Sequence, residues 1–384
     1  MFRKRRWQLA ACCLLTALLT TAAVVGTEAV LLNRLTGSAS ESVRFLRTMS
    51  LLKCNYNGEI DNHQLFDGAI KGMVEAAGDP YTVYLNSKDF QQLSEMTGGS
   101  FGGIGIVFGK RGNDYVVISA LEDNPGAKAG IKSGDIITAI DGKTTRDMNM
   151  EQVANKIRGK HGTVVKLELK GKDGKLRTVS VERGEIKNPS VGGQLLPDTK
   201  IGYIRIAVFN ENTGDDFAKK YAELEKQGMQ ALVLDLRSNP GGVFDAGVAV
   251  AGMLVPKGPI VSVVDKNGNK YEETSSLEKV KYPLAVLVDH GSASAAEIVA
   301  GAIKDTKSGK LFGTKTFGKG SVQSVYRLDS NTAVKITVAK YYTPSGVSIH
   351  NVGIEPDVKV ELPEDATIDV QLKAAEDYLL QQLQ

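Results

Sequence analysis

Two short apolar runs, each followed by a turn of small residues and then by helical spacing, constrain the fold of this chain most strongly. Residues 231–236 lead into the turn 237–242, and residues 284–288 lead into the turn 289–297. Continuous apolar runs of this length are typical of strands that a parallel sheet buries on both faces. Helical spacing over 213–226, 246–254 and 298–303 alternates with these runs and with an apolar strand at 201–207. The alternation predicts an α/β core.

The turn after the second apolar run carries Ser294 directly before a predicted helix. The first amides of a helix have no partner inside the helix, so they are free to receive negative charge. A serine nucleophile here has the amide of Ala295 beside it as one donor to an oxyanion. Gly241 or Gly242 of the first turn can bring a second donor, because a backbone without side chains lets a substrate carbonyl approach.

A lysine among glycines offers a base for this serine. Lys319 lies within residues 316–323, which read Thr-Phe-Gly-Lys-Gly-Ser-Val-Gln. Lysine acts as a base only when it is neutral, and the small and apolar neighbours of Lys319 permit the desolvation that this requires. If 319–323 is extended, Lys319 and Gln323 point to the same face, and Gln323 can hold the amine without adding charge. The residues predict acyl transfer by a Ser–Lys pair.

Other side chains compete for these roles. Ser292 precedes Ser294 by two residues, and Ser321 stands beside Lys319. A Ser–His–acid arrangement would enlist His290 with Asp289 or Glu297. Only four residues separate His290 from Ser294, so the turn would have to fold back on itself.

The N-terminal segment, residues 1–32, reads as a signal peptide or signal-anchor. A basic cluster at 3–6 precedes an apolar run from Leu9 to Val25. The positive flank is expected to stay in the cytoplasm. An uncleaved anchor would place the protein in the bacterial cell membrane as a single-pass protein with its catalytic part extracytoplasmic. Cleavage would make it secreted or periplasmic. Residues 38–95 then show helical spacing and predict a packing or dimerisation arm.

Residues 96–184 change to short strands and turns. A glycine loop at Gly103-Ile104-Gly105-Ile106 runs into a strand, and Asp141-Gly142 and Asp173-Gly174 mark hairpin turns. The series Ala-Gly-Ile, Gly-Asp-Ile-Ile and Ile-Asp-Gly between 129 and 142 follows. With these residues the segment resembles a PDZ domain. The physics agrees, because successive amides of a glycine loop can hold a terminal carboxylate and the next strand edge can accept an extended peptide.

Charge and composition exclude other classes of protein. The chain has 47 basic and 44 acidic residues, and four of the basic ones lie at positions 3–6, which leaves a nearly neutral remainder. Such a balance gives no argument for nucleic acid as a partner. The three cysteines imply no disulfide framework, and none of the four histidines lies in an HExxH pattern. We therefore expect no metal and no cofactor.

Taken together, the turns at 239–242, 291–297 and 316–323 resemble the C-terminal processing peptidases, a serine protease family that includes the tail-specific proteases. The resemblance covers nearly everything from the N-terminal helices to residue 357. It implies a multidomain α/β protein with a helical N-terminal region, an inserted PDZ domain, and a crotonase-like or ClpP-like protease core over 185–384. It also implies that Ser294 is the nucleophile, that Lys319 and Gln323 assist it, and that the turn 239–242 lines the oxyanion hole.

The expected function is therefore exported serine endopeptidase activity on proteins whose free, apolar C-termini bind the PDZ loop. Arg158, at the end of a predicted helix in the PDZ-like segment, is a candidate gating residue that would couple peptide binding to activity. The chain departs from the family pattern at Ala296, Val347 and His350.

Two other functions compete with peptidase activity. One is a membrane-tethered PDZ scaffold without catalysis. The other is a nucleotide binder, because residues 313–319 fit GxxxxGK, although Gly320 replaces the Ser or Thr that would hold magnesium.

Overall fold

The computed structural model describes residues 26–27, 30–31, 33–34, 36–363 and 367–384. The predicted targeting segment, residues 1–32, lies almost entirely outside this part of the chain. Among the described helices, none is both long and apolar enough to cross a membrane. The chain divides into two compact units, residues 1–73 and 74–384, and each is described by itself.

The first unit contains helix α2 (Ala39–Asn55) and most of helix α3 (Asn62–Glu75). Ser38 begins α2 as its N-cap, and its side chain accepts a hydrogen bond from the Glu41 amide. Apolar residues of both helices line a cavity of about 320 Å³. Many others stay in solvent, for example Val43 at 56% and Leu51 at 54% exposure. This unit therefore buries only part of its apolar surface.

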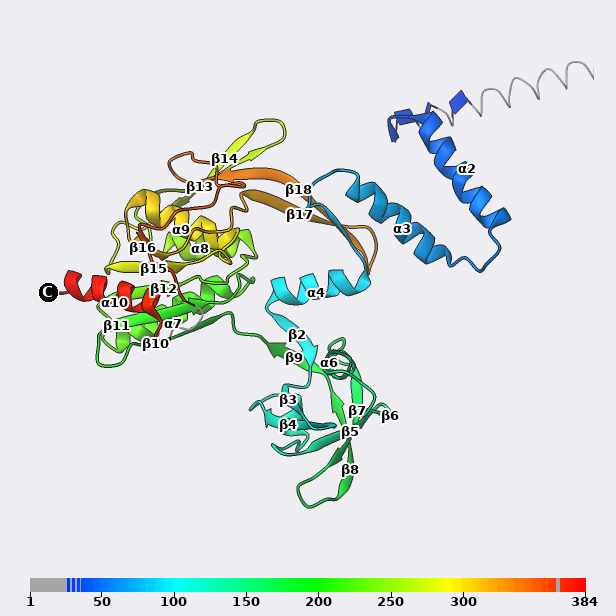
Figure 1. Cartoon of the computed structure of the whole chain (residues 1–384), viewed down its shortest axis with the longest axis horizontal. Helices are drawn as coiled ribbons and strands as arrows, with labels where there is room; N and C mark the ends of the chain where they lie inside the picture. The colour runs from blue at the N-terminus through cyan, green and yellow to red at the C-terminus, as the bar shows by residue number, and fades with distance from the viewer. Residues whose placement is uncertain (1–25, 28–29, 32, 35, 364–366) are drawn as a thin grey trace, which may run out of the picture. The chain divides into compact units, whose positions relative to one another are not determined.

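A six-stranded sheet forms the centre of the second unit, in the order β10-β11-β12-β15-β16-β19 (Figure 1). Only β10 is antiparallel to its neighbour. The two apolar runs become β12 and β15, which are buried at every position. The strands are β10 (Val191–Leu195), β11 (Ile201–Ile206), β12 (Ala231–Asp235), β15 (Leu284–Val288), β16 (Lys310–Gly313) and β19 (Val358–Lys359).

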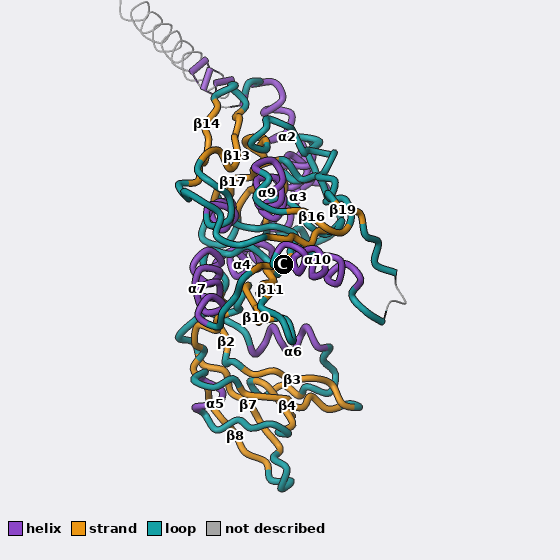
Figure 2. The backbone as a smooth tube through the Cα atoms, turned by 90° about the vertical axis from the view of Figure 1, so that its left-hand side faces the viewer, coloured by secondary structure: helices purple, strands orange, loops and turns teal. Residues whose placement is uncertain are grey.

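Helices cover both faces of this sheet. Leu232 and Leu234 pack with α7 (Thr213–Lys226), α8 (Phe244–Gly252) and α9 (Ala295–Thr306). The alternate residues Ala231 and Val233 face the other way, onto α10 (Val370–Gln382). Figure 2 shows α7 and α10 on opposite sides of β10 and β11. The α/β fold class predicted from the alternation is confirmed.

A second sheet packs against α8 and α9. Its order is β1-β18-β13-β14, and β17 pairs with β18. The strands are β1 (Val83–Leu85), β13 (Gly258–Asp265), β14 (Lys270–Ser275), β17 (Ser321–Arg327) and β18 (Ala333–Tyr342). The polar composition of residues 256–281 predicts a surface excursion, and that prediction is wrong. Ile260, Val261 and Val263 of β13 are buried in the same core as α8 and α9, because β13 pairs with both β14 and β18.

Residues 74–99 differ from the predicted all-helical segment. The strand β1 interrupts the helical spacing and pairs with β18 through Val83 and Lys335. Helix α4 (Ser87–Gly98) follows, begun by Asn86 and ended by Gly99 in the left-handed conformation. Pairing between residues about 250 apart in the chain leaves no local signal, so the sequence pattern could not predict β1.

The PDZ-like domain begins and ends at a two-stranded ribbon formed by β2 (Ser100–Gly103) and β9 (Gly184–Lys187). Its sheet has the order β3-β4-β5-β7-β8, with β6 on β5. The elements are β3 (Ile106–Arg111), β4 (Asp114–Ala120), α5 (Pro125–Lys128), β5 (Ile136–Ile140), β6 (Lys143–Thr144), α6 (Met150–Ile157), β7 (Val164–Lys170) and β8 (Leu176–Glu182). Tyr115, Ile137 and Leu167 centre its own core.

A buried ion cluster ties the C-terminal helix to β12. Arg237 donates hydrogen bonds to Asp235 and to both carboxylate oxygens of Asp369, the N-cap of α10. Burial alone would lower the pKa of Arg237, but the hydrogen bonds and charges of the two aspartates raise it above its usual value. The charged form is therefore the stable one.

Candidate active site

The Ser294 turn has an unusual backbone. It connects the end of β15 to the start of α9, and Ser294 has φ 55° and ψ −116°. A non-glycine residue at positive φ is uncommon and costs free energy, so the surrounding contacts must hold it in place. The Ser292 side chain supplies one such contact, since it donates to the Leu236 carbonyl at 2.8 Å and is fully buried. Ser292 is therefore engaged in the fold, whereas Ser294 lines a cavity.

The glycine turn 239–242 lies against the Ser294 turn. The Ala293 amide donates to the Asn239 carbonyl at 2.9 Å. A Cβ on Gly241 would stand 2.6 Å from the Ser294 Cβ and 2.9 Å from the Ala295 amide nitrogen. Gly241 also has φ 90°, so only glycine fits without strain.

The amides of these two turns differ in what they bind. The Gly241 amide donates to the Asn239 side chain at 2.8 Å. In the described part of the chain, the amides of Gly242 and Ala295 donate to no other group. Of the two glycines that the sequence proposes, Gly242 is thus the one whose amide can serve an oxyanion together with Ala295.

Glu297 connects the Ser294 turn to the Lys319 loop. Its fully buried carboxylate accepts hydrogen bonds from the amides of Ser294 (2.9 Å), Gly318 (2.7 Å) and Lys319 (2.8 Å). The Thr316 hydroxyl donates to it at 2.6 Å. Four donors match the acceptor capacity of an ionised carboxylate. The sequence offers Glu297 only as the acid of a competing Ser–His–acid arrangement, whereas the structure makes it the link between the two segments that carry Ser294 and Lys319.

Tyr341 of β18 adds a second link. Its hydroxyl lies 3.0 Å from the Ser294 carbonyl and within hydrogen-bond distance of the Lys319 carbonyl. Burial raises the pKa of Tyr341 well above its usual value, and the charge of Glu297 raises it further. The hydroxyl therefore keeps its proton and remains a donor.

The Lys319 side chain is half-buried, with its amine 5.1 Å from the centre of the Tyr81 ring. Burial lowers the pKa of Lys319 below its usual value, and the charge of Lys335 lowers it further, against the opposing effects of Glu297 and Asp79. The neutral amine is thus easier to form here than in water. A cation–π contact favours the ammonium instead, so Tyr81 works against this shift.

The catalytic candidates are close together without forming a hydrogen-bonded chain. Among the described residues, no hydrogen bond joins the Ser294 hydroxyl to the Lys319 amine. The Gln323 amide donates to the hydroxyls of Ser321 (2.9 Å) and Thr337 (3.3 Å) and not to Lys319. A proton transfer between the two side chains would therefore first need a rearrangement that brings them into hydrogen-bond geometry.

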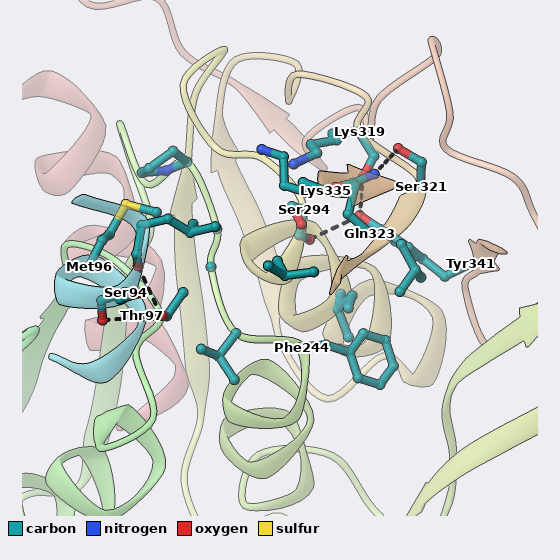
Figure 3. A pocket seen from close by; sticks show the side chains of 18 of the residues that line it. Ser94, Met96, Thr97, Phe244, Ser294, Lys319, Ser321, Gln323, Lys335 and Tyr341 are labelled. Atoms are coloured by element: carbon teal, nitrogen blue, oxygen red, sulfur yellow. Dashed lines mark hydrogen bonds between the residues drawn. The ribbon is translucent and has the colours of Figure 1, made fainter. Parts of the chain in front are cut away.

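One cavity of about 570 Å³ collects these residues (Figure 3). Ser294, Lys319, Gln323, Gly241 and Gly242 all line it. Helix α4 contributes an opposite wall, on which Figure 3 shows Ser94, Met96 and Thr97. The remaining lining residues are mostly apolar: Phe90, Leu93, Pro240, Val243, Phe244, Ile298, Ser321, Val322, Val325, Arg327, Lys335 and Tyr341. An extended peptide with apolar side chains fits such walls.

The other predicted residues lie in the PDZ-like domain. Gly103 ends β2 and Ile106 begins β3, with buried Ile104 and Gly105 between them. Gly105 has φ 68°, and a Cβ there would lie 2.3 Å from the Asn124 side chain. Arg158 caps the end of α6, and its guanidinium lies 4.6 Å from the centre of the Phe101 ring on β2.

The structure disfavours two of the competing arrangements. The exposed His290 packs its ring against Phe317, and no hydrogen bond joins it to Ser294 in the described part of the chain. Residues 314–320 lead from β16 into the strand β17, whereas a phosphate-binding loop of the GxxxxGK type needs a helix after its lysine.

No sequence pattern indicates that Tyr81, Lys335 or helix α4 belongs to the site. The pair Asp79-Pro80 is typical of a turn and is the one local signal near Tyr81. Asp79 in fact holds this turn by accepting hydrogen bonds from the Tyr81 amide and the Thr82 hydroxyl. The turn is what brings Tyr81 to Lys319.

Comparison with known families places three matches along the chain. Residues 200–360 match the model of peptidase family S41, and residues 116–171 match a PDZ domain. Residues 27–89 match the N-terminal domain of the activating protease CtpB.

Individual proteins give the same result. The carboxy-terminal processing protease CtpA of Bacillus subtilis (strain 168) is 38% identical over 319 residues, which cover 83% of this chain and 68% of CtpA. The carboxy-terminal-processing protease of Bartonella bacilliformis is 34% identical, over 90% of this chain and 81% of its own. A solved structure from Bacteroides fragilis NCTC 9343, described as an S41 protease, is similar in fold, with a TM-score of 0.51 at 16% identity over 86% of this chain and 93% of its own.

Proposed function

The chain belongs to the carboxy-terminal processing proteases of peptidase family S41, and from this premise we propose that Ser294 and Lys319 carry out its peptide-bond hydrolysis. Serine-type peptidase activity and a PDZ domain come with the family. The observation that supports these residues is their shared cavity, which Gly242 also lines. Among the described residues, the amides of Gly242 and of Ala295, the residue after Ser294, donate to no other group.

In the proposed reaction, the neutral Lys319 amine takes the proton of the Ser294 hydroxyl while its oxygen attacks the substrate carbonyl. The amides of Gly242 and Ala295 donate to the resulting oxyanion. The lysine then gives its proton to the leaving amine, and water hydrolyses the acyl-enzyme by the reverse sequence of proton transfers. Gln323 is placed to hold the amine once Lys319 has turned away from Tyr81, because its amide is neutral and lies on the same cavity.

Substrate selection belongs to the PDZ-like domain in this proposal. The loop Gly103–Ile106 would bind the free C-terminus of a protein, and Arg158 would pass the effect of binding to β2 through Phe101. The proposed divisions of the chain are 1–32 for targeting, 38–95 for the helical region, 96–184 for the PDZ domain and 185–384 for the protease core.

Location and assembly are further parts of the proposal. The basic and apolar character of residues 1–32 supports export and, if the segment is kept, anchoring in the membrane with the protease outside the cytoplasm. The exposed apolar residues of α2, including Val43, Phe45 and Leu46, support a homodimer.

Cleavage of a model unfolded protein tests the two catalytic assignments. β-Casein is incubated with the wild type, Ser294→Ala and Lys319→Ala, and the products are identified by mass spectrometry. We expect both variants to lose at least about 10³-fold in rate, because nucleophile and base act as one unit. Lys315→Ala is the matched control. Lys315 is an exposed lysine in the loop that carries Lys319, and it pairs with Glu355. This variant should cleave casein like the wild type.

The same experiment separates the competing functions. Cleavage by Ser294→Ala at the wild-type rate would show that another residue is the nucleophile. A wild type that binds C-terminal peptides and never cuts casein would establish the scaffold function instead.

A further inference from the structure

We propose that Lys335 and Arg327 form an anion-binding subsite in the Ser294 cavity, which selects substrates carrying a carboxylate a few residues from the scissile bond. This inference rests on the proposed function, since it concerns the substrate of the same site. It adds a requirement for negative charge to a cavity whose walls are otherwise mostly apolar.

The register of two strands places both cations on the cavity. β17 and β18 are antiparallel, with Val325 paired to Lys335 and Arg327 paired to Ala333. Alternate residues of a strand share a face, so Gln323, Val325 and Arg327 turn to the cavity together. Lys335 joins them from across the ladder. Its diagonal neighbour is Arg327, about 7–8 Å away, so both side chains can reach one carboxylate.

The cavity holds no charge to balance these cations. Its lining residues include Lys319, Lys335 and Arg327 but no aspartate, glutamate or histidine. Neither Lys335 nor Arg327 forms an ion pair with any described residue, whereas Lys304 pairs with Asp357 and Lys315 with Glu355 elsewhere in the core. Lys335 is partly buried beside apolar walls, which reduce the screening of its charge by water, whereas Arg327 is exposed. Lys335 therefore supplies the stronger attraction for an anionic group, and Arg327 adds to it.

Packing holds the Arg327 side chain in position. Its guanidinium lies 5.3 Å from the centre of the Phe90 ring on α4, so the contact bridges two walls of the cavity. An arginine stacked on an aromatic ring still presents its N–H groups at the edge of the plane, where a carboxylate can accept two of them. Lys335 and Lys319 line the same cavity, and the charge of Lys335 acts on Lys319, so this part of the subsite is near the proposed base (Figure 3).

Two parts of a substrate could supply the carboxylate: an acidic side chain or the terminal carboxylate of the cleaved segment. Peptides distinguish them. A casein cleavage site mapped by mass spectrometry gives a parent peptide in which every acidic residue is replaced by its amide. In one series, each peptide carries either one Glu or one Gln at one of the four positions on either side of the scissile bond. In a second series, the peptides end at successive positions, and each is made with its C-terminus as the free acid and as the amide.

For the wild type, we expect Glu to raise kcat/KM over Gln about tenfold at one or two adjacent positions, roughly the effect of one charge-assisted hydrogen bond. A terminal source would instead give the gain only to free acids that end at those positions. In Lys335→Gln and Arg327→Gln the ratio of kcat/KM for Glu over Gln should fall towards one, and in Lys335→Glu the preference should reverse, with Gln cleaved faster than Glu. Lys340→Gln, on β18 but away from the cavity, is the control and should keep the wild-type ratio.

A ratio near one at every position and for every terminus in the wild type would overturn the subsite. A ratio that survives in the Lys335→Gln, Arg327→Gln double variant would do the same. Failure of the proposed function looks different, because the uncharged parent peptide and casein would then remain uncut.

Discussion

At the scale of single residues, the proposed mechanism depends on the protonation state of the Lys319 amine. Its amine must lose a proton to act as a base, and burial and the charge of Lys335 both lower its pKa. The Tyr81 ring, whose centre is 5.1 Å from the amine, stabilises the ammonium. Neighbours with opposing effects thus set the balance between a resting ammonium and a reactive amine.

Removing the charge of Lys335 should shift the pH dependence of cleavage. Activity needs neutral Lys319, so kcat/KM rises as pH increases through the pKa of this lysine. Lys335→Met removes a like charge and raises that pKa, which moves the acidic limb of the profile to higher pH. The profile is measured with a peptide that has no acidic side chain, so that the anion subsite does not contribute.

Lys340→Met is the matched control for this profile and should leave the acidic limb in place, because its side chain does not line the cavity. A limb that stays fixed or moves to lower pH in Lys335→Met would show that Lys335 does not act on the catalytic base.

At the scale of elements, the site is a junction between the start of α9, the turn 239–242 and the loop before β17. None of these segments is close to another in sequence. Buried hydrogen bonds hold them in register, above all the four that Glu297 accepts from the Ser294 turn and from residues 316–319. The positive φ of Ser294 is sustained by this junction.

Glu297→Gln tests that junction. The amide can keep two acceptor bonds at its oxygen, and the Thr316 hydroxyl can rotate to accept from the new NH₂ group. The Gly318 amide then faces a donor and remains unsatisfied, which costs about 1–3 kcal/mol. We expect a melting temperature lowered by several degrees and a kcat reduced far more than KM is changed, because the loop carrying Lys319 shifts.

The exposed Glu355, which pairs with Lys315, provides the control variant Glu355→Gln, and calorimetry and casein cleavage should find it unchanged. Wild-type kcat in a folded Glu297→Gln protein would show that the junction does not position the catalytic pair.

At the scale of the whole molecule, the compact unit of residues 74–384 contains both the PDZ-like domain and the protease core. Contacts between the two run through the ribbon β2–β9 and through α4. The Thr97 carbonyl accepts from the Glu211 amide, Lys88 pairs with Glu151 of α6, and Arg158 stacks on Phe101. Helix α4 also walls the Ser294 cavity, so these contacts connect the PDZ-like domain with the site. We propose that they carry the effect of peptide binding.

Arg158→Ala should weaken that route without weakening peptide binding. We expect a C-terminal peptide to stimulate casein cleavage by the wild type and to stimulate the variant much less. Affinity for the peptide, measured by calorimetry, should stay the same, because Arg158 contacts β2 and not the Gly103–Ile106 loop. Arg146→Ala, an exposed arginine of the same domain, serves as the control. Equal stimulation of Arg158→Ala and the wild type would remove Arg158 from the coupling.

Local patterns were sufficient for much of the fold and for the main site candidates. The buried runs 231–235 and 284–288, the helix 213–226 and the hairpins of the PDZ-like domain were all predicted within a few residues of their observed bounds. Small residues in short motifs indicate Ser294, Lys319 and the pair Gly241 and Gly242. Gln323 follows from the face that it would share with Lys319 on an extended segment. The strands β1 and β13 were missed, since a three-residue strand and a run flanked by polar residues carry weak local signals.

The sequence by itself determined the α/β class, the PDZ insertion and the short motifs that carry the candidate nucleophile and base, because these depend on residues adjacent in the chain. Only the tertiary structure decided what surrounds those motifs. In the folded chain, Glu297 is buried between two turns and the Tyr81 ring lies against the Lys319 amine. The Gly241 amide is bound to the Asn239 side chain, whereas the Gly242 amide has no partner among the described residues. It also placed Lys335 and Arg327 without a counter-charge on the same cavity. Burial, charge and hydrogen-bond partners come from residues far apart in sequence, and folding alone brings them together.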